Sequence, residues 1–339
     1  MIYFFGDVHF SSMNPWNNAA GENFISWFKE RFKDENKTNY AIFLGDVSDK
    51  DTNPGDVVDQ MFRLFSFCSE HFKKTDILMG NHDLKLFRGH TVQTALKFLN
   101  NFKNVEVIDD ICGIERDGKH ILCLPHKRVS CGDINKYYSE YDWENDVYAA
   151  ADYQLAIGHW AIQNKDDIRF RNGVDISKIP VDKEHSPMPR GVLCGHIHNR
   201  PTNEYIGSIW PLNAEEQKCK YPRCFIKWSD NWEEEPLPEF MKFETITYGV
   251  EVPKHQDIPV VYTIEDAPSE GDVNRTYPDI FIRGIKQNKK NDEKSSTTEQ
   301  IDLTLNDDPL DLFNEMVKEQ NLTITRGALK VVRELLKKD

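Results

Sequence analysis

Residues 80–83 read Gly-Asn-His-Asp, and they follow the apolar run Ile-Leu-Met at residues 77–79, which is typical of a buried strand. An amide, an imidazole and a carboxylate in succession are an unusual choice for a simple turn. Open α/β sheets bind ligands at the carboxyl ends of their strands. This turn therefore places a metal-binding Asn81 and a proton-carrying His82 where a site is expected, and we expect the other polar motifs to converge on it.

Four other apolar runs end in the same way, with Gly followed by Asp or His. Their polar residues are Asp7 and His9, Asp46 and Asp49, His159, and His196 and His198. Alternate residues of extended backbone share a face, so Asp7 and His9 can point to one place. Carboxylate, imidazole and amide oxygen together suit two divalent cations, with manganese or iron ahead of magnesium. The five strand ends predict a two-metal site that activates a water and neutralises a phosphate.

The order of these motifs is D-x-H, G-D-x-x-D, G-N-H-D, G-H and G-H-x-H, and it resembles the signature of the calcineurin-like metallophosphoesterases. The resemblance implies a β-sandwich flanked by helices and two Mn²⁺ ions, with Mg²⁺ or Fe²⁺ as substitutes. It implies two ligand sets that share a bridging Asp46, namely Asp7, His9, Asp46 and His198 for one metal and Asp46, Asn81, His159 and His196 for the other. It also implies that His82 contacts the phosphate and assists the leaving oxygen, and that Asp49 and Asp83 orient imidazoles.

Strand-like and helix-like runs alternate over residues 1–230, which predicts an α/β fold with a mostly parallel sheet. The composition shifts to Glu and Pro around residues 231–239, and we expect a small α+β capping domain over residues 231–286. Residues 287–300 contain no apolar residue, and we expect a flexible linker over residues 287–306. Residues 307–339 contain two amphipathic stretches and predict a helical module. We expect this module to bind a partner; the alternative is that it packs back on the main body.

A narrower resemblance concerns the stretch from Gly195 through Ser208 to Glu215, which is similar to SbcD-type nuclease subunits of DNA double-strand-break repair. The order of nuclease domain, capping domain, linker and helical module is also similar, and the short chain is similar to phage-encoded recombination endonuclease subunits. This resemblance implies a 3′–5′ exonuclease and single-strand endonuclease acting on DNA, a homodimer of nuclease subunits, and an SMC-like ATPase partner bound by the C-terminal helices. The sequence departs from the pattern after Asp46, where repair nucleases often carry a bulkier apolar residue.

The 339-residue chain has a formal net charge of −14. Proteins that bind nucleic acid by phosphate contacts alone are usually basic, so DNA binding depends here on the metals, a partner or a local basic patch. The candidates for phosphate contacts are His126, Lys127, Arg128 and Arg200; the alternative for each is an ordinary surface or loop residue. We expect no signal peptide or membrane span, and a cytoplasmic protein, in the host cytoplasm if it is phage-encoded.

Two other functions remain open on the same fold. One is a stand-alone metallophosphoesterase that acts on a small phosphoester or a phosphoprotein, which would not need a linker and a helical tail. The other is an inactive interaction scaffold. Because no ligand position departs from the motif pattern, the sequence argues against a scaffold that has lost its metals.

Overall fold

The structure is a computed structural model, and it describes residues 1–11, 14–49, 55–87, 90–92, 95–127, 133–143, 152–164, 171–219, 221–252 and 258–287. The expected helical module, and the linker beyond residue 287, lie outside the described residues. Residues 1–288 form one compact unit.

A six-stranded sheet forms the first layer, in the order β12-β11-β1-β2-β3-β6. The strands β1, β2, β3 and β6 run parallel, while β11 and β12 are antiparallel additions at one edge. The strands are β1 (Ile2–Phe5), β2 (Tyr40–Phe43), β3 (Lys74–Leu78), β6 (Val105–Ile108), β11 (Cys224–Trp228) and β12 (Trp232–Pro236). Every residue of β1 and β2 is buried, as expected for parallel strands that are covered on both faces.

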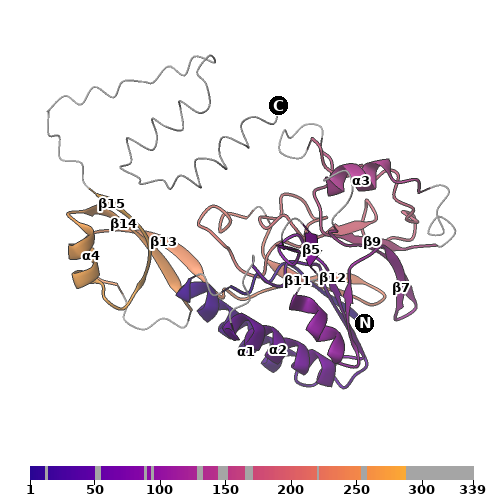
Figure 1. Cartoon of the computed structure of the whole chain (residues 1–339), viewed down its shortest axis with the longest axis horizontal. Coiled ribbons are helices and arrows are strands. Elements are labelled where there is room, and N and C mark those ends of the chain that lie inside the picture. Colours follow the sequence, from indigo (N-terminus) through magenta and orange to yellow (C-terminus); the bar gives the residue numbers. More distant parts are fainter. Residues whose placement is uncertain are drawn as a thin grey trace, which may run out of the picture. The chain divides into compact units, whose positions relative to one another are not determined.

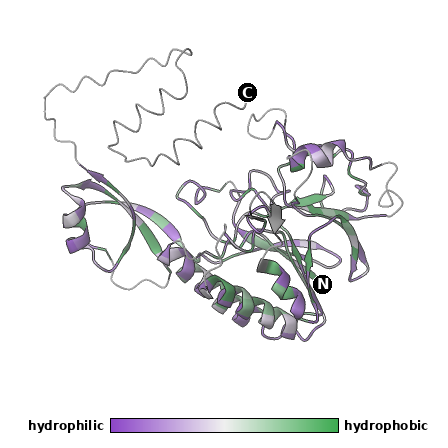
Figure 2. Ribbon diagram, viewed as in Figure 1, coloured by the Kyte–Doolittle hydropathy of each residue, from purple (hydrophilic) through white to green (hydrophobic). Residues whose placement is uncertain are grey.

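Helices α1 (Pro15–Phe32) and α2 (Gly55–His71) cover one face of this sheet (Figure 1). Helix α1 begins with a proline. Proline suits this position because the N–H that it lacks would have no partner within the helix. Phe24 and Phe28 of α1 and Met61 of α2 join Phe5 and Phe43 of the sheet in one buried cluster. Both helices accordingly carry hydrophobic as well as hydrophilic residues in Figure 2. Among the described helices, none has the length and apolar character that a membrane span requires.

A four-stranded sheet forms the second layer, in the order β10-β9-β8-β7. Its strands are β7 (Cys112–Arg116), β8 (Lys119–Leu124), β9 (Leu155–Gly158) and β10 (Val192–Cys194). Phe4 and Ile42 of the first sheet share a buried cluster with Ile121 and Ile157 of the second, so the sheets pack face to face. Helix α3 (Ile134–Glu140) covers the outer face through Tyr138. The expected mixed α/β fold is confirmed, and the two layers fit the sandwich that the resemblance implies.

Short elements connect β3 to β6. They are β4 (Lys85–Phe87), β5 (His90–Val92) and the 3-10 helix η1 (Ala95–Asn101). The strands β4 and β5 form a two-stranded antiparallel pair. This connection leaves the turn after β3 at the carboxyl edge of the sheet.

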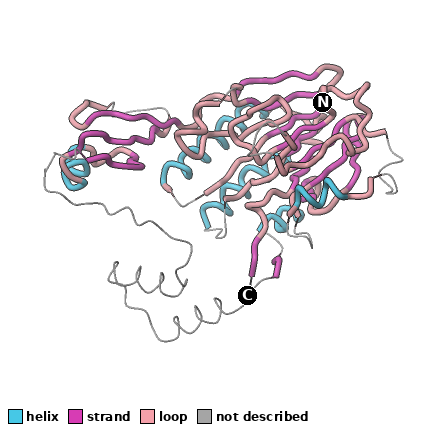
Figure 3. The backbone as a smooth tube through the Cα atoms, turned by 90° about the horizontal axis from the view of Figure 1, so that it is seen from above, coloured by secondary structure: helices cyan, strands magenta, loops and turns pink. Residues whose placement is uncertain are grey.

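A third, three-stranded sheet has the order β13-β14-β15, and all its strands are parallel. Its elements are β13 (Lys242–Thr247), β14 (Val260–Ala267), β15 (Phe281–Gln287) and helix α4 (Glu270–Thr276). Val261 faces the cluster of α1 and α2, whereas Tyr262 and Ile264 face Val273 of α4. Figure 3 shows these strands grouped with their helix.

The expected domain boundary at residue 231 falls between β11 and β12, which pair along their whole lengths in the first sheet. Residues 232–236 therefore belong to the first layer, and the separate sheet starts only at β13. The Glu- and Pro-rich composition misled the sequence interpretation, because charged residues are also typical of an edge strand. Glu233 and Glu235 of β12 pair with Lys227 of β11.

Candidate metal centre

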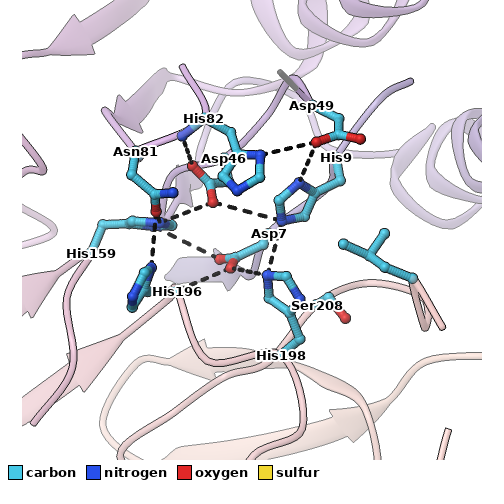
Figure 4. Close-up of polar contacts among 12 residues, drawn as sticks. Asp7, His9, Asp46, Asp49, Asn81, His82, His159, His196, His198 and Ser208 are labelled. Carbon is cyan, nitrogen blue, oxygen red and sulfur yellow. Dashed lines mark hydrogen bonds and ion pairs between the residues drawn. The ribbon is translucent and has the colours of Figure 1, made fainter. Parts of the chain in front are cut away.

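The polar residues of all five strand ends meet in one place (Figure 4). They follow three parallel strands of the first sheet and two parallel strands of the second. Asp7 and His9 follow β1, Asp46 and Asp49 follow β2, Asn81 and His82 follow β3, His159 follows β9, and His196 and His198 follow β10. The carboxyl ends of parallel strands lie at the same edge of a sheet, so the sandwich delivers both sets of side chains to a common site.

A first cluster joins Asp7, His9, Asp46 and His198, whose ligand atoms lie within 4.8 Å of one another. The Nε2 atoms of His9 and His198 are only 3.0 Å apart. His198 Nε2 is 3.4 Å from Asp7 Oδ2, and His9 Nε2 is 3.6 Å from Asp46 Oδ2. At most one of the two facing ring nitrogens can carry a hydrogen in this contact, so the arrangement offers lone pairs and carboxylates to a shared cation.

A second cluster joins Asp46, His159 and His196. His159 Nε2 is 3.1 Å from Asp46 Oδ2. Asn81 completes this group, because its Oδ1 lies 3.0 Å from His159 Nε2 and 2.9 Å from His196 Nδ1. His159 Nδ1 lies 2.7 Å from the Leu44 carbonyl oxygen. Donation to that carbonyl leaves Nε2 as the ligand atom. Asp46 belongs to both clusters and is the shared carboxylate.

The backbone around these side chains is tightly constrained. His9, Asp46 and His196 have positive φ angles of 53°, 47° and 72°, a conformation that is uncommon outside glycine and recurs at functional sites. A Cβ atom on Gly80 would collide with Asp46, and one on Gly195 would collide with an oxygen of Asp7. Gly80 and Gly195 are therefore required by the close approach of the loops.

The charges of the centre are strongly coupled. Burial raises the pKa of Asp7 to about 7 and lowers the pKa values of His9 and His196 to about 3. Burial alone would also lower the pKa of His159, but the charges of Asp46 and Asp7 raise it to about 10. The same contact with His159 holds the pKa of Asp46 well below its usual range despite burial. Without a metal, an imidazolium at His159 balances the Asp46 carboxylate.

The donor set fits a pair of divalent cations. Asp7, His9 and His159 are completely buried, and Asp46 is 1% exposed. Among the described residues, Asp7 Oδ1 and His9 Nδ1 are buried atoms for which no hydrogen-bond partner is found. Buried polar atoms are normally satisfied, because leaving them unpaired costs about 1–3 kcal/mol each. Carboxylate, imidazole and amide donors around two overlapping sets of atoms match a dinuclear site of borderline-to-hard metals.

His82 lies beside both clusters. Its backbone N–H donates to Asp46 Oδ1 at 2.7 Å, which ties the residue to the shared carboxylate. Its ring Nδ1 is 2.9 Å from Asp49 Oδ1, and the same oxygen is 3.9 Å from His9 Nδ1. Asp49 therefore bonds to the ring of His82 and lies near the ring of His9.

Comparison with known proteins identifies the family. The family model for the calcineurin-like phosphoesterases matches residues 1–200, which is more than half of the chain. The chain belongs to the calcineurin-like phosphoesterase family. Members are metal-dependent phosphoester hydrolases with two metals, and the candidate ligands of this phosphoesterase lie within the matched residues.

Other comparisons are less informative. No curated protein matches the phosphoesterase. One solved structure, a protein of unknown function from Aquifex aeolicus, is 18% identical, covers 53% of this chain and 86% of its own, and has a TM-score of 0.26.

Asp83 has a different environment from the one expected. Its Oδ1 accepts hydrogen bonds from the backbone N–H and the hydroxyl of Ser48, and its Oδ2 accepts from the backbone N–H of Gly80. These donors belong to the loops after β2 and β3 and not to an imidazole. In this phosphoesterase Asp83 joins the two loops, which positions Asp46 and Asn81 indirectly. Burial raises its pKa to about 6, and the charge of Asp46 acts in the same direction.

The predicted substrate contacts after β8 differ in their distance from the centre and in their partners. His126 lies next to the centre, with its ring centroid 6.4 Å from that of His159, and burial lowers its pKa to about 4. Lys127 already pairs with Asp110 at 2.5 Å and lies over the ring of Tyr137. Arg128 lies outside the described residues. A role of His126 in substrate binding stays a prediction that its position favours.

Arg200 does not have the position expected of a substrate contact. Its side chain is completely buried. Its guanidinium donates to the carbonyl oxygens of Tyr205 and Pro222 and to the Glu234 carboxylate. These bonds use the guanidinium to fix the loop after β10 against β12. The sequence interpretation gave Arg200 as a candidate phosphate contact, with a surface charge as the alternative. It could not foresee that backbone carbonyls would be the partners, because no residue type marks them.

Sequence reasoning missed Glu216, which contacts a candidate ligand. Glu216 Oε1 lies 3.3 Å from His198 Nδ1. Burial alone would lower the pKa of His198 and raise that of Glu216, but the mutual charge of the pair reverses both shifts. The available signal was the Asn-x-x-Glu pattern that Asn213 and Glu216 form, which resembles a capping box.

Proposed function

We propose that this phosphoesterase is the manganese-dependent nuclease subunit of an SbcCD-like recombination and repair complex. It hydrolyses DNA phosphodiesters as a 3′–5′ exonuclease and a single-strand endonuclease. The observation that carries this proposal is the place of residues 205–215, which belong to the stretch that resembles SbcD-type subunits. They lie directly against the candidate metal centre.

The contacts of this stretch support the proposal. Ser208 forms an isolated parallel bridge with Asp7. The Asp7 backbone N–H donates to the Gly207 carbonyl, and the Ile209 N–H donates to the Asp7 carbonyl at 2.9 Å. Both backbone groups of Asp7, at the end of β1, are thus bonded to this stretch. A segment that carries a branch-specific resemblance therefore helps to build the catalytic centre.

Different residues of the protein have different roles in the proposed reaction. When bound, the metal pair supplies Lewis acidity for the phosphate and an activated water. Asp46, which belongs to both clusters, would be the carboxylate available to both metals, and Asn81 would supply a neutral oxygen. Asp49 accepts from His82 Nδ1 and fixes the ring, so we assign proton donation to the leaving oxygen to His82 Nε2. Proton transfer of this kind contributes about 10²–10⁴-fold to rates.

The remaining assignments of the proposal concern partners. The net charge of −14 disfavours tight DNA binding by this subunit alone. We therefore assign part of the DNA attraction to an SMC-like ATPase, bound through residues 307–339, and to a homodimer of nuclease subunits. The proposed location is the cytoplasm.

The test compares wild-type protein with His82→Ala and Asp46→Asn. Linear duplex DNA labelled at its 5′ ends and circular single-stranded DNA are incubated with Mn²⁺. We expect the wild type to shorten the duplex from its 3′ ends and to cut the circle. A phosphorothioate at the 3′ terminus should block the first activity. His82→Ala should lose at least about 100-fold in turnover while it still binds two Mn²⁺, and Asp46→Asn should disturb both metals. A fully active His82→Ala would refute the role of His82.

The second candidate is a stand-alone phosphoesterase, which the acidic charge favours. It predicts turnover of p-nitrophenyl phosphate or a phosphopeptide and no cleavage of either DNA. The nuclease predicts the reverse preference, with turnover of bis-p-nitrophenyl phosphate. If the protein binds no Mn²⁺ and hydrolyses none of these substrates, the inactive scaffold is the correct reading.

A further inference from the structure

We propose that Glu216 is a positioning residue of the metal centre, which holds the His198 ring so that Nε2 faces the first ligand cluster. The inference rests on the dinuclear centre of the phosphoesterase, but it does not depend on DNA as the substrate. Glu216 lies on the connection between β10 and β11, outside the family match at residues 1–200.

The geometry of the His198 ring carries the proposal. Its two nitrogens face different partners. Nε2 faces the cluster, 3.0 Å from His9 Nε2 and 3.4 Å from Asp7 Oδ2, and Nδ1 faces Glu216 Oε1 at 3.3 Å. A neutral imidazole donates from one nitrogen and ligates through the other. Donation from Nδ1 to a carboxylate therefore selects the tautomer with an available lone pair on Nε2 and makes that atom more basic.

The Glu216 carboxylate is itself held in place. Oε2 accepts from the backbone N–H of Leu212 at 2.9 Å, and Oε1 accepts from the side-chain amide of Asn213 at 2.6 Å. The Glu216 N–H in turn donates to Asn213 Oδ1 at 3.0 Å. Its carbonyl accepts from Arg223 at 2.7 Å. A carboxylate that is held by this many contacts can fix the orientation of the His198 ring. A mobile surface glutamate could not do so.

The next residue anchors the turn on its other side. Gln217 Oε1 accepts from the backbone N–H of Phe243 at 2.5 Å, at the start of β13. The turn that carries Glu216 is thus bound to the third sheet as well as to the metal centre. Glu215, one residue earlier, is exposed, and it supplies a matched control with the same charge in the same turn.

The test measures Mn²⁺ binding by isothermal titration calorimetry, together with the turnover of bis-p-nitrophenyl phosphate. Glu216→Ala should weaken one of two Mn²⁺ sites by about 10–100-fold, the usual effect of removing a carboxylate behind a ligating histidine. Glu216→Gln keeps an acceptor of the same shape and should restore part of that affinity. Glu215→Gln should bind both metals as the wild type does.

The possible results distinguish the role of Glu216 from the proposed nuclease function. Thermal unfolding checks that each variant is folded, and the isosteric Glu216→Gln decides the question if Glu216→Ala does not fold. Two unchanged Mn²⁺ sites in Glu216→Gln and in any folded Glu216→Ala would overturn the proposal. Equal weakening of both sites would also overturn it, because only His198 is contacted. Selective weakening without DNA cleavage by the wild type would support Glu216 while the nuclease function fails.

Discussion

The carboxylate of Asp49 lies beside two imidazole rings of this phosphoesterase. Its Oδ1 is 2.9 Å from His82 Nδ1 and 3.9 Å from His9 Nδ1. His9 belongs to the first ligand cluster, whereas His82 is the proposed proton donor. Asp49 therefore links the metal centre to the leaving-group side of the site, and its stronger contact is with His82.

We expect Asp49→Asn to reduce turnover of bis-p-nitrophenyl phosphate by about 10–100-fold, because a neutral amide orients the His82 ring less firmly. Calorimetry should find two Mn²⁺ sites of nearly unchanged affinity, since His9 Nε2 faces the cluster independently of Asp49. Asp59→Asn on α2 is the matched control, as Asp59 is 60% exposed. Unchanged turnover in Asp49→Asn would show that His82 needs no orienting carboxylate.

The titration of the metal-free centre leads to a pH prediction. The pKa of Asp7 is raised to about 7 by burial, and that of His159 is raised to about 10 by Asp46 and Asp7, which outweigh burial. Both groups must lose their protons to act as ligands. The metal-free state therefore binds more protons, so Mn²⁺ affinity should rise with pH between about 6 and 8.

Calorimetry in buffers of different ionisation enthalpy measures the protons released. We expect a net release of about one proton or more per protein at pH 7. His185 provides a control, since it forms an exposed pair with Asp182 and His185→Ala should leave the count unchanged. An affinity that does not vary with pH would mean that both ligands are already deprotonated in the metal-free protein.

At the scale of elements, the loop after β10 is held by a buried cation. Arg200→Met should destabilise the protein by roughly 3 kcal/mol, because two carbonyls lose a donor and each loss costs about 1–3 kcal/mol. Urea unfolding measures this change. Arg190→Met is the control, since Arg190 is 44% exposed and 3.7 Å from its partner Glu204, and it should cost less than about 1 kcal/mol. A loss of substrate affinity at unchanged stability would instead restore Arg200 as a substrate contact.

The strand ends were readable from the sequence because each polar motif follows an apolar run, and parallel strands bring their carboxyl ends together. Contacts that depend on loops were not readable. The partner of Asp83 is a backbone amide of Ser48, and the partners of Arg200 are backbone carbonyls, which no residue type marks. Strand β12 was not predicted from the sequence, because the glutamates of this edge strand give it the composition of a linker.

At the scale of the whole molecule, the described residues place every candidate ligand within one compact unit that ends at Asn288. All three buried clusters around the two main sheets are formed by residues up to Phe281. The candidate ligands and these three clusters therefore lie within residues 1–288. Under the proposed function, that remaining segment serves the partner.

Truncation after Asn288 tests this division. We expect the truncated protein to unfold at the same temperature as the full chain and to retain turnover of bis-p-nitrophenyl phosphate, because the centre and its supporting contacts remain. It should lose the capture of an SMC-like ATPase. Leu335→Glu, which places a charge in the apolar stripe predicted from the sequence, should lose capture at full length. A truncated protein that still captures the ATPase would contradict the assignment of the tail, and one that loses turnover would show that the tail supports the catalytic unit.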